Sequence, residues 1–290
     1  MIRRVDAHHH VWDLSVRDQP WMSGDGMTPI RRSFGVDEFV EQAEANGMVA
    51  SVVVQTVAEV AETEELLELA ATSPFVAVVV GFVDVAAGDV GDQLDRLLER
   101  PSGSWLVGIR SLVQYEPDPH WLSRPEVLAG LAEVARRGLC NELLILPHQL
   151  QHVVDAVRTT EGRFVIDHLG KPAIASSAWE PWATEFATVA RLDNVSAKVS
   201  GLVTEADWSA WTVDGVRPYV DHAISAFGPE RIMFGSDWPV CTLAATYDRV
   251  VGLVEQCVAG FTADERAAIF GGNAVDVYAL DSTPGVVGIR

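Results

Sequence analysis

Residues 51–84, SVVVQTVAEVAETEELLELAATSPFVAVVVGFVD, contain two short apolar runs joined by a stretch with a different pattern. The runs Ser51–Thr56 and Phe75–Asp84 are rich in valine and nearly continuous in hydrophobicity, which is typical of strands buried on both faces. Between them, Glu59–Ser73 carries its apolar residues at helical spacing. A strand, a helix and a second strand in this order predict a βαβ unit with parallel strands.

The same alternation extends over most of the chain. Eight apolar runs predict strands, at Arg4–Trp12, Ser51–Thr56, Phe75–Asp84, Leu106–Leu112, Gly138–Leu146, Arg163–Gly170, Asn194–Gly201 and Ile232–Trp238. Helical patterns lie between them, among them Val36–Gly47, Glu59–Ser73, Arg124–Gly138 and Val216–Gly228. Eight such units in 290 residues predict an α/β fold, a parallel (β/α)8 TIM barrel, and no GxGxxG fingerprint of an open dinucleotide-binding sheet follows an early strand.

We expect one domain over residues 1–290, because no linker or low-complexity stretch divides the chain. The segment Leu14–Ser33 after the first strand is long and irregular, and we expect it to be a loop that covers a substrate. Residues 281–290, DSTPGVVGIR, are expected to form a peripheral tail.

Bulk properties exclude several partners and suggest a compartment. The formal net charge of −20 disfavours nucleic acid and anionic membranes, because like charges repel. The apolar run Phe75–Val83 is about half of the ~20 residues that a membrane helix needs, and no signal peptide is visible. The three cysteines, Cys140, Cys241 and Cys257, form no CxxC pair and indicate free thiols. We expect a cytoplasmic protein, and the sequence leaves a monomer and a homodimer both open.

Polar residues gather where the predicted strands end. They are His8, His9 and His10 on the first strand, Arg110 on the fourth, His168 on the sixth, Lys198 on the seventh and Asp237 on the eighth. In a parallel barrel the carboxyl ends of all strands meet at one rim, where active sites lie. The sequence therefore predicts one site built from these side chains.

The histidine triplet is expected to divide into a pair and a single residue. Side chains alternate along a strand, so His8 and His10 can face the barrel mouth together while His9 points outward. With His168 and Asp237, they offer three imidazoles and a carboxylate, which suit Zn²⁺ or a similar ion with one position open for water. The alternatives are a hydrogen-bonded core histidine at His168 and a turn or helix-cap residue at Asp237.

Two cationic residues and a second pair of histidines give weaker evidence of function. The chain has only two lysines, and Lys198 lies within a strand, so it is a candidate for binding substrate oxygens, with a structural ion pair as the alternative. Arg110 can bind a carboxylate in a fork or brace a barrel glutamate. In PHQLQH no Glu follows His148, so the metalloprotease HExxH motif is absent, and His152 is expected on a helix surface.

Seven segments, in this order, carry a family resemblance: VDAHHHVWD, VVVQT, GIRSLVQ, FVIDHLGKP, AKVSGL, IMFGSDWPV and GGNAVDVYAL. Together they resemble the amidohydrolase superfamily, specifically its amidohydrolase-2 branch of lactone hydrolases. Known members of that branch open L-fuconolactone, L-rhamnono-lactone, sulfomuconolactone or pyrone-dicarboxylate lactone. The segment DQPWM after the first strand is also similar to the D-Y-P-W-L of sugar lactonases.

The resemblance implies roles for individual residues. The H-x-H role falls to His8 and His10, the histidine of strand six to His168, and the acid of strand eight to Asp237. Substrate contacts are implied for the side chains of Arg110, Trp21, Gln55, Lys198 and Trp238.

Some residues depart from the family pattern. Arg110 stands where binuclear members have a bridging lysine, and Glu142 stands where lactonase relatives tend to have Asp. Both departures disfavour a two-metal centre and leave Glu142 as a further candidate ligand. Since some members of the branch act without a metal, the resemblance leaves open whether one divalent ion, Zn²⁺ by preference, is bound.

The function expected from these observations is hydrolysis of a small-molecule lactone. His8, His10 and His168, directly or through one divalent ion, polarise the carbonyl, and Asp237 acts as general base and then as general acid. The alternatives are a metal-dependent decarboxylase of an aromatic or unsaturated acid on the same scaffold, and a binding protein without catalysis.

Overall fold

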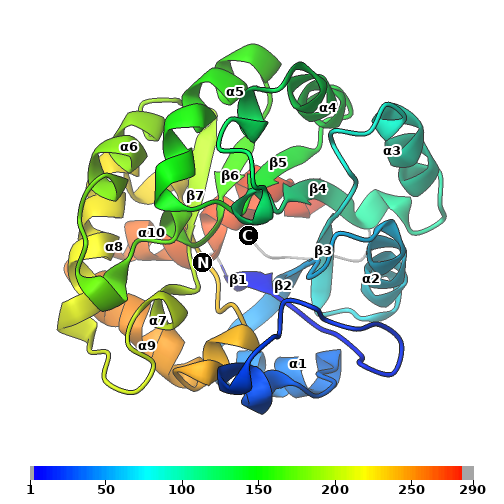
Figure 1. Ribbon diagram of the computed structural model, residues 1–290. Coiled ribbons are helices and arrows are strands. Elements are labelled where there is room, and N and C mark those ends of the chain that lie inside the picture. The colour runs from blue at the N-terminus through cyan, green and yellow to red at the C-terminus, as the bar shows by residue number, and fades with distance from the viewer. Residues whose placement is uncertain (1–2, 283–290) are drawn as a thin grey trace.

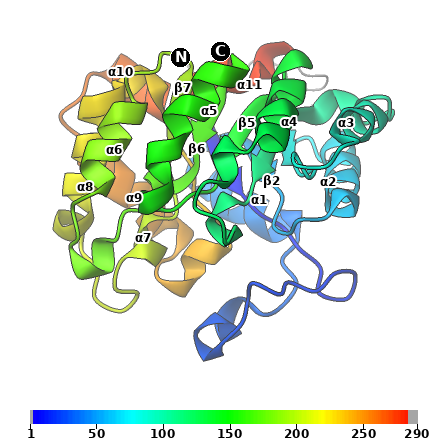
Figure 2. The same ribbon diagram turned by 45° about the horizontal axis from the view of Figure 1, so that its top comes forward.

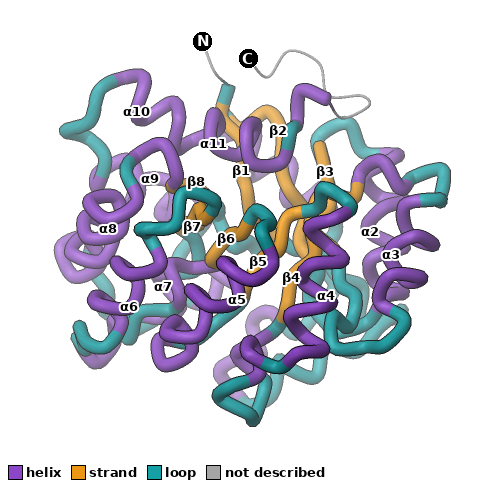
Figure 3. Tube along the Cα trace, turned by 90° about the horizontal axis from the view of Figure 1, so that it is seen from above, coloured by secondary structure: helices purple, strands orange, loops and turns teal. Residues whose placement is uncertain are grey.

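Eight parallel strands form the centre of the protein, whose computed structural model describes residues 3–282. The strands are β1 Arg4–His9, β2 Met48–Val54, β3 Val76–Gly81, β4 Leu106–Ser111, β5 Cys140–Leu143, β6 Phe164–Ile166, β7 Val195–Val199 and β8 Ile232–Phe234. They lie side by side in the order of the sequence, and helices surround them (Figures 1 and 3). The predicted (β/α)8 barrel is confirmed.

The first and last strands meet through the residues that follow them. His9 pairs with Trp238 in an isolated parallel bridge. On either side of it, the Asp237 amide donates to the His8 carbonyl at 2.8 Å, and the His10 amide donates to the Trp238 carbonyl at 2.7 Å. This seam closes the barrel at its carboxyl end and brings together chain segments more than 200 residues apart.

The helices of the described part of the chain cover the outside of the barrel. They are α1 Val36–Ala45, α2 Val60–Thr72, α3 Val90–Leu98, α4 Pro125–Arg136, α5 Val153–Thr160, α6 Trp182–Val189, α7 Leu202–Glu205, α8 Val213–Phe227, α9 Tyr247–Cys257, α10 Ala263–Ala267 and α11 Asn273–Tyr278. The four helices expected from spacing are present to within a few residues. Helix α8 begins three residues early because the side chain of Thr212 caps it by accepting from the Gly215 amide.

Valines of the strands divide between two hydrophobic layers. Val52 and Val54 of β2 pack inside the barrel, while Val53 packs against the helices. The interior cluster also includes Tyr278 of α11, so this helix reaches the barrel core. Burial on both faces explains why the strands appear in the sequence as continuous apolar runs.

Several strands are shorter than predicted because their last residues turn into the βα loops. The sixth ends at Ile166 rather than Gly170, and the eighth ends at Phe234 rather than Trp238. The loop Leu14–Ser33, dark blue in Figure 2, projects beyond the strand ends and contains a 3₁₀ turn at Asp25–Ile30. Of the predicted tail, residues 283–290 lie outside the described part of the chain.

Within residues 3–282, no helix combines the length and the apolar character that crossing a membrane requires.

Candidate active site at the β1–β8 seam

An extra residue in β1 sets the direction in which the histidine side chains point. Between Asp6 and His9 the strand advances three residues while its partner β2 advances two, from Ser51 to Val53, which is a β-bulge. The Asp6 carboxylate holds the bulge, because its Oδ1 accepts from the amides of His8 at 3.0 Å and Ser236 at 2.9 Å. Burial raises the pKa of this carboxyl to about 6.

His8 and His10 face the same space, and His9 does not. The Nε2 atoms of His8 and His10 lie 3.2 Å apart. The His9 ring stacks on Phe39 of α1, with ring centroids 3.6 Å apart, and contacts Ser51 on the outside of the barrel. The structure therefore places the pair and the single histidine as alternation predicts.

His168 approaches from the other side of the barrel mouth. It begins a turn of four consecutive residues with left-handed backbone, His168 to Lys171, whose φ angles are 52°, 52°, 69° and 53°. Its Nδ1 lies 2.8 Å from Ser200 Oγ, and Gly201 leaves room beside the ring. A Cβ at Gly201 would lie 2.6 Å from His168 Nδ1, so the site needs glycine there.

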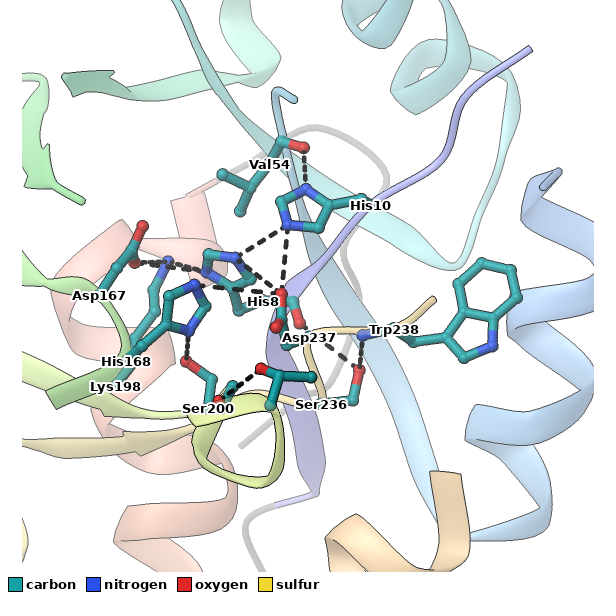
Figure 4. Close-up of polar contacts among 12 residues, drawn as sticks. His8, His10, Val54, Asp167, His168, Lys198, Ser200, Ser236, Asp237 and Trp238 are labelled. Atoms are coloured by element: carbon teal, nitrogen blue, oxygen red, sulfur yellow. Dashed lines mark hydrogen bonds and ion pairs between the residues drawn. The ribbon is translucent and has the colours of Figure 1, made fainter. Parts of the chain in front are cut away.

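Asp237 completes the cluster from the β8 side (Figure 4). Its Oδ1 lies 3.3 Å from His10 Nε2, 3.7 Å from His8 Nε2 and 4.0 Å from His168 Nε2. Asp237 also has a left-handed backbone, with φ of 57°. Non-glycine residues in this conformation concentrate at functional sites, where surrounding structure holds them in place.

The pKa values of His8, His168 and Asp237 favour two neutral rings beside a charged carboxylate. Burial lowers the pKa of His8 well below 6.5 and lowers that of His168 as well. For Asp237 burial acts in the opposite direction, but the neighbouring His168, His10 and His8 outweigh it and hold the pKa of the carboxyl below its usual value. The site therefore presents imidazole lone pairs beside an anion at neutral pH.

This donor set fits one divalent metal ion. His10 Nδ1 donates to the Val54 carbonyl at 2.7 Å, so the lone pair of its Nε2 lies on the side of Asp237, and His8 Nε2 lies 3.7 Å from the same carboxylate. Zinc bonds of about 2.0–2.1 Å in a tetrahedron place ligand atoms about 3.3–3.4 Å apart, close to the spacings found here. His8, His10 and Asp237 form a group that could hold an ion, and His168 adjoins it.

Lys198 lies beneath the histidines, fully buried and away from the cavity. Its ammonium donates to Glu142 Oε2 at 2.6 Å and lies 3.4 Å from Asp167 Oδ1 and 3.2 Å from His8 Nδ1. Tyr278 donates to the other oxygen of Glu142. Burial raises the pKa of Glu142 to about 7, whereas for Asp167 the Lys198 ammonium and the contact with His8 outweigh burial and keep the pKa low.

The side chains implied as substrate contacts separate into two groups. Arg110 and Trp21 line a cavity of about 90 Å³ together with His10, His168 and Asp237. Gln55, Lys198 and Trp238 are not among its lining residues. Trp238 is buried and packs edge-on against Phe34, and Gln55 is buried behind Arg110.

Arg110 is anchored as well as exposed to the cavity. It contacts Asp167 Oδ2 at 3.3 Å and donates to the Gln55 carbonyl. The carboxylate that braces it is therefore Asp167 and not Glu142. His152 lies at the surface with its ring 4.9 Å from that of His120, and His148 is likewise not among the cavity-lining residues.

The sequence reasoning missed three residues of this site. Asp167 contacts His8, Lys198 and Arg110, although it directly precedes His168 in the motif DHLGKP that was singled out. Ser200 and Tyr278 also lie in quoted motifs. The available signal was that Asp167 and Ser200 lie near the ends of predicted strands and that Tyr278 lies in a quoted motif, but a single sequence gives no distances between such motifs.

Comparisons with known proteins identify the family of this chain. The model of the family described as Amidohydrolase matches residues 5–280, and the chain belongs to this family. It is 37% identical over 289 residues to an L-fucono-1,5-lactonase of Burkholderia multivorans, covering 96% of each chain. An L-fucono-1,5-lactonase of Burkholderia ambifaria is 34% identical over 290 residues, covering 98% of each. The resemblance drawn from the sequence motifs is confirmed.

Solved structures agree in fold. An amidohydrolase from Burkholderia multivorans with bound Zn superposes with a TM-score of 0.90 at 36% identity, covering 96% of this chain and 99% of that chain. A 2,6-dihydroxybenzoate decarboxylase superposes with a TM-score of 0.65 at 15% identity, covering 97% of this chain and 99% of that chain, and this likeness shows the fold alone.

Proposed function

We propose that this protein is a lactonase, a hydrolase that opens a cyclic ester by attack of water. The observation that carries the proposal is the convergence of three imidazole Nε2 atoms on the Asp237 carboxylate at the edge of a cavity. The similarity to two lactonases over nearly the full chain supports it and favours a sugar-acid lactone as substrate.

One divalent ion, Zn²⁺ by preference, would be held by His8, His10, His168 and Asp237. Once bound, it would supply a Lewis-acid charge that polarises the lactone carbonyl. Bound Zn in the similar amidohydrolase supports this choice of metal. Glu142 is not a ligand in this proposal, because Lys198 and Tyr278 occupy both of its carboxylate oxygens.

The chain itself supplies proton transfer and positioning. Asp237 stays ionised, so its carboxylate can accept a proton from the attacking water and return it to the ring oxygen that leaves. Arg110 lines the cavity and would hold an oxygen of the substrate, and Trp21 offers an apolar ring face. Gln55, Lys198 and Trp238 support these residues from behind.

A lactone screen tests the proposal. Acid release from sugar-acid and muconate-type lactones is followed with a pH indicator, for the wild type and Asp237→Asn, with and without a chelator. We expect activity in the wild type and a loss of at least 10²-fold in Asp237→Asn. Asp92→Asn, on the exposed face of α3, is the matched control and should behave like the wild type.

Near-normal turnover by Asp237→Asn would refute the mechanism. Release of carbon dioxide from an aryl acid, with no lactone turned over, would favour the decarboxylase instead. The expectations of a cytoplasmic location and of no binding to nucleic acid stay predictions, as does the choice between monomer and homodimer.

A further inference from the structure

An ion pair stands at the same cavity as the proposed reacting centre. Lys171 Nζ lies 3.0 Å from Glu205 Oε1, and both side chains are about one-fifth to one-quarter exposed, at 21% and 24%. Both residues line the cavity with Asp237 and His168. Partly exposed ion pairs of this kind add little to stability, so the pair needs another explanation.

The backbone fixes Lys171 relative to the reacting centre. It ends the left-handed turn that begins with His168, and its amide donates to the His168 carbonyl at 2.8 Å. Trp182 Nε1 donates to the Leu169 carbonyl at 2.7 Å, and Leu169 is completely buried. A turn that holds three non-glycine residues in a disfavoured conformation is typical of a functional segment, and it carries both a cluster histidine and Lys171.

Glu205 is fixed in a comparable way from the next strand. It ends the short helix α7, which begins directly after Gly201. Gly201 lies against His168 and Asp237. The two partners of the ion pair are therefore held by two different βα connections, each of which also contacts the His/Asp cluster.

The chemistry of the pair fits hydroxyl groups. An ammonium donates to a hydroxyl oxygen, and a carboxylate accepts from a hydroxyl hydrogen, so neighbouring hydroxyls of one substrate satisfy both partners. The pair has no net charge. A carboxylate entering at the same place would gain from Lys171 but be repelled by Glu205 and by Asp237, while Arg110 on the same cavity is already paired with Asp167.

We propose that Lys171 and Glu205 form a specificity clamp that binds hydroxyls of a neutral polyhydroxylated lactone and disfavours lactones bearing a carboxylate. This inference rests on the proposed lactonase function and adds two residues that determine the substrate class.

Kinetics with two matched substrates tests the clamp. One is a neutral aldonolactone, and the other is the aldaric monolactone in which the terminal carbon is oxidised to a carboxylate. The wild type should favour the neutral lactone in kcat/KM by at least ~30-fold. Glu205→Gln keeps the size and removes the charge, and it should shift this preference toward the carboxylate by at least ~10-fold, mainly through KM.

Lys171→Met should shift the preference in the opposite direction, because the negative charge of Glu205 is then uncompensated. The control is Glu255→Gln, which removes an ion pair with Arg4. Arg4 is the first residue of β1 and so lies at the opposite end of the barrel from the site, and this variant should leave the preference unchanged. Thermal melts check that each variant is folded. The exchanged pair Lys171→Glu with Glu205→Lys keeps an ion pair and gives a further measurement if one single variant does not fold.

The outcomes separate the two proposals. Hydrolysis of lactones with a preference that moves by less than twofold in the folded variants would overturn the clamp and leave the lactonase function standing. A wild type that prefers the carboxylate-bearing lactone would overturn it as well. If the wild type hydrolyses no lactone of either type, both proposals fall.

Discussion

Replacing Gly201 with alanine tests the packing of the site against a defined contact. The new Cβ would lie 2.6 Å from His168 Nδ1 and 3.1 Å from Asp237 Oδ2, whereas ordinary contacts begin at 3.4 Å. The His168 ring would therefore have to retreat by 3.4 − 2.6 = 0.8 Å. A displacement of about 1 Å at a reacting centre can cost about 10²-fold in rate, so we expect kcat/KM to fall by roughly that factor.

The cost in stability should be small by comparison. Gly201 has φ of +63°, and alanine in this conformation costs about 1–2 kcal/mol. For a chain of 290 residues, the unfolding entropy is about 0.6 kcal/mol per degree, so the melting temperature should fall by only about 2–3 °C. The protein should thus remain folded at the assay temperature while its activity is lost.

Gly138→Ala is the matched control. Gly138 has φ of +76°, yet a Cβ there meets nothing within 4 Å. The control should show the same small loss in melting temperature with normal kcat/KM. The reasoning is refuted if folded Gly201→Ala keeps activity within about threefold of the wild type, or if Gly138→Ala loses activity to the same extent.

Three further substitutions test other parts of the site. His9→Gln should keep turnover, since His9 packs on Phe39 outside the cavity. Because burial lowers the pKa of His9, below pH 6.5 the unfolded wild type binds a proton at His9 that the folded wild type does not. In urea denaturation the variant should therefore lose about 1.4 kcal/mol less stability per pH unit of acidification than the wild type. Asp167→Asn should weaken metal affinity by roughly 10–100-fold in chelator competition, because Asp167 orients His8, and unchanged affinity would contradict that role. Lys198→Met should lower the free energy of unfolding by roughly 3 kcal/mol, and adding Glu142→Leu should recover part of it, whereas additive losses would speak against a buried pair.

The fold could be predicted because each strand is buried on both faces and each helix on one. Valine runs such as the one at Val76–Gly81 appear directly in the sequence, and the glycines at 138 and 228 mark helix ends with positive φ. The positions at which the strands end were harder to predict. The predicted sixth strand runs on to Gly170 because His168 to Gly170 follow the apolar run Phe164–Ile166 closely, but His168 to Lys171 adopt a left-handed turn, which local composition does not indicate.

The residue types of the site could be predicted, but not which side chains reach the cavity and which lie below it. Lys198 was identified as unusual, yet nothing local shows that it lies below His8 rather than in the cavity, because that depends on Glu142 and Asp167 from two other strands. The orientation of His8 was predicted from simple alternation. Val5 and Ala7 also pack inside the barrel, so strict alternation over all of β1 would have turned His8 outward. The bulge allows Val5, Ala7 and His8 all to face inward, and no sequence pattern predicts the bulge.

The bulge and the seam also make the site depend on barrel closure. Asp6 binds the amides of His8 and Ser236, and the Asp237 amide binds the His8 carbonyl, so the same few bonds join the first and last strands and set the spacing of the cluster. Opening the seam would separate the His8–His10 pair from Asp237. A ligand that contacts both sides binds only the closed form, and by linkage it stabilises closure in proportion to its affinity. Placing the reacting groups across this seam thus couples occupancy of the site to the integrity of the whole barrel.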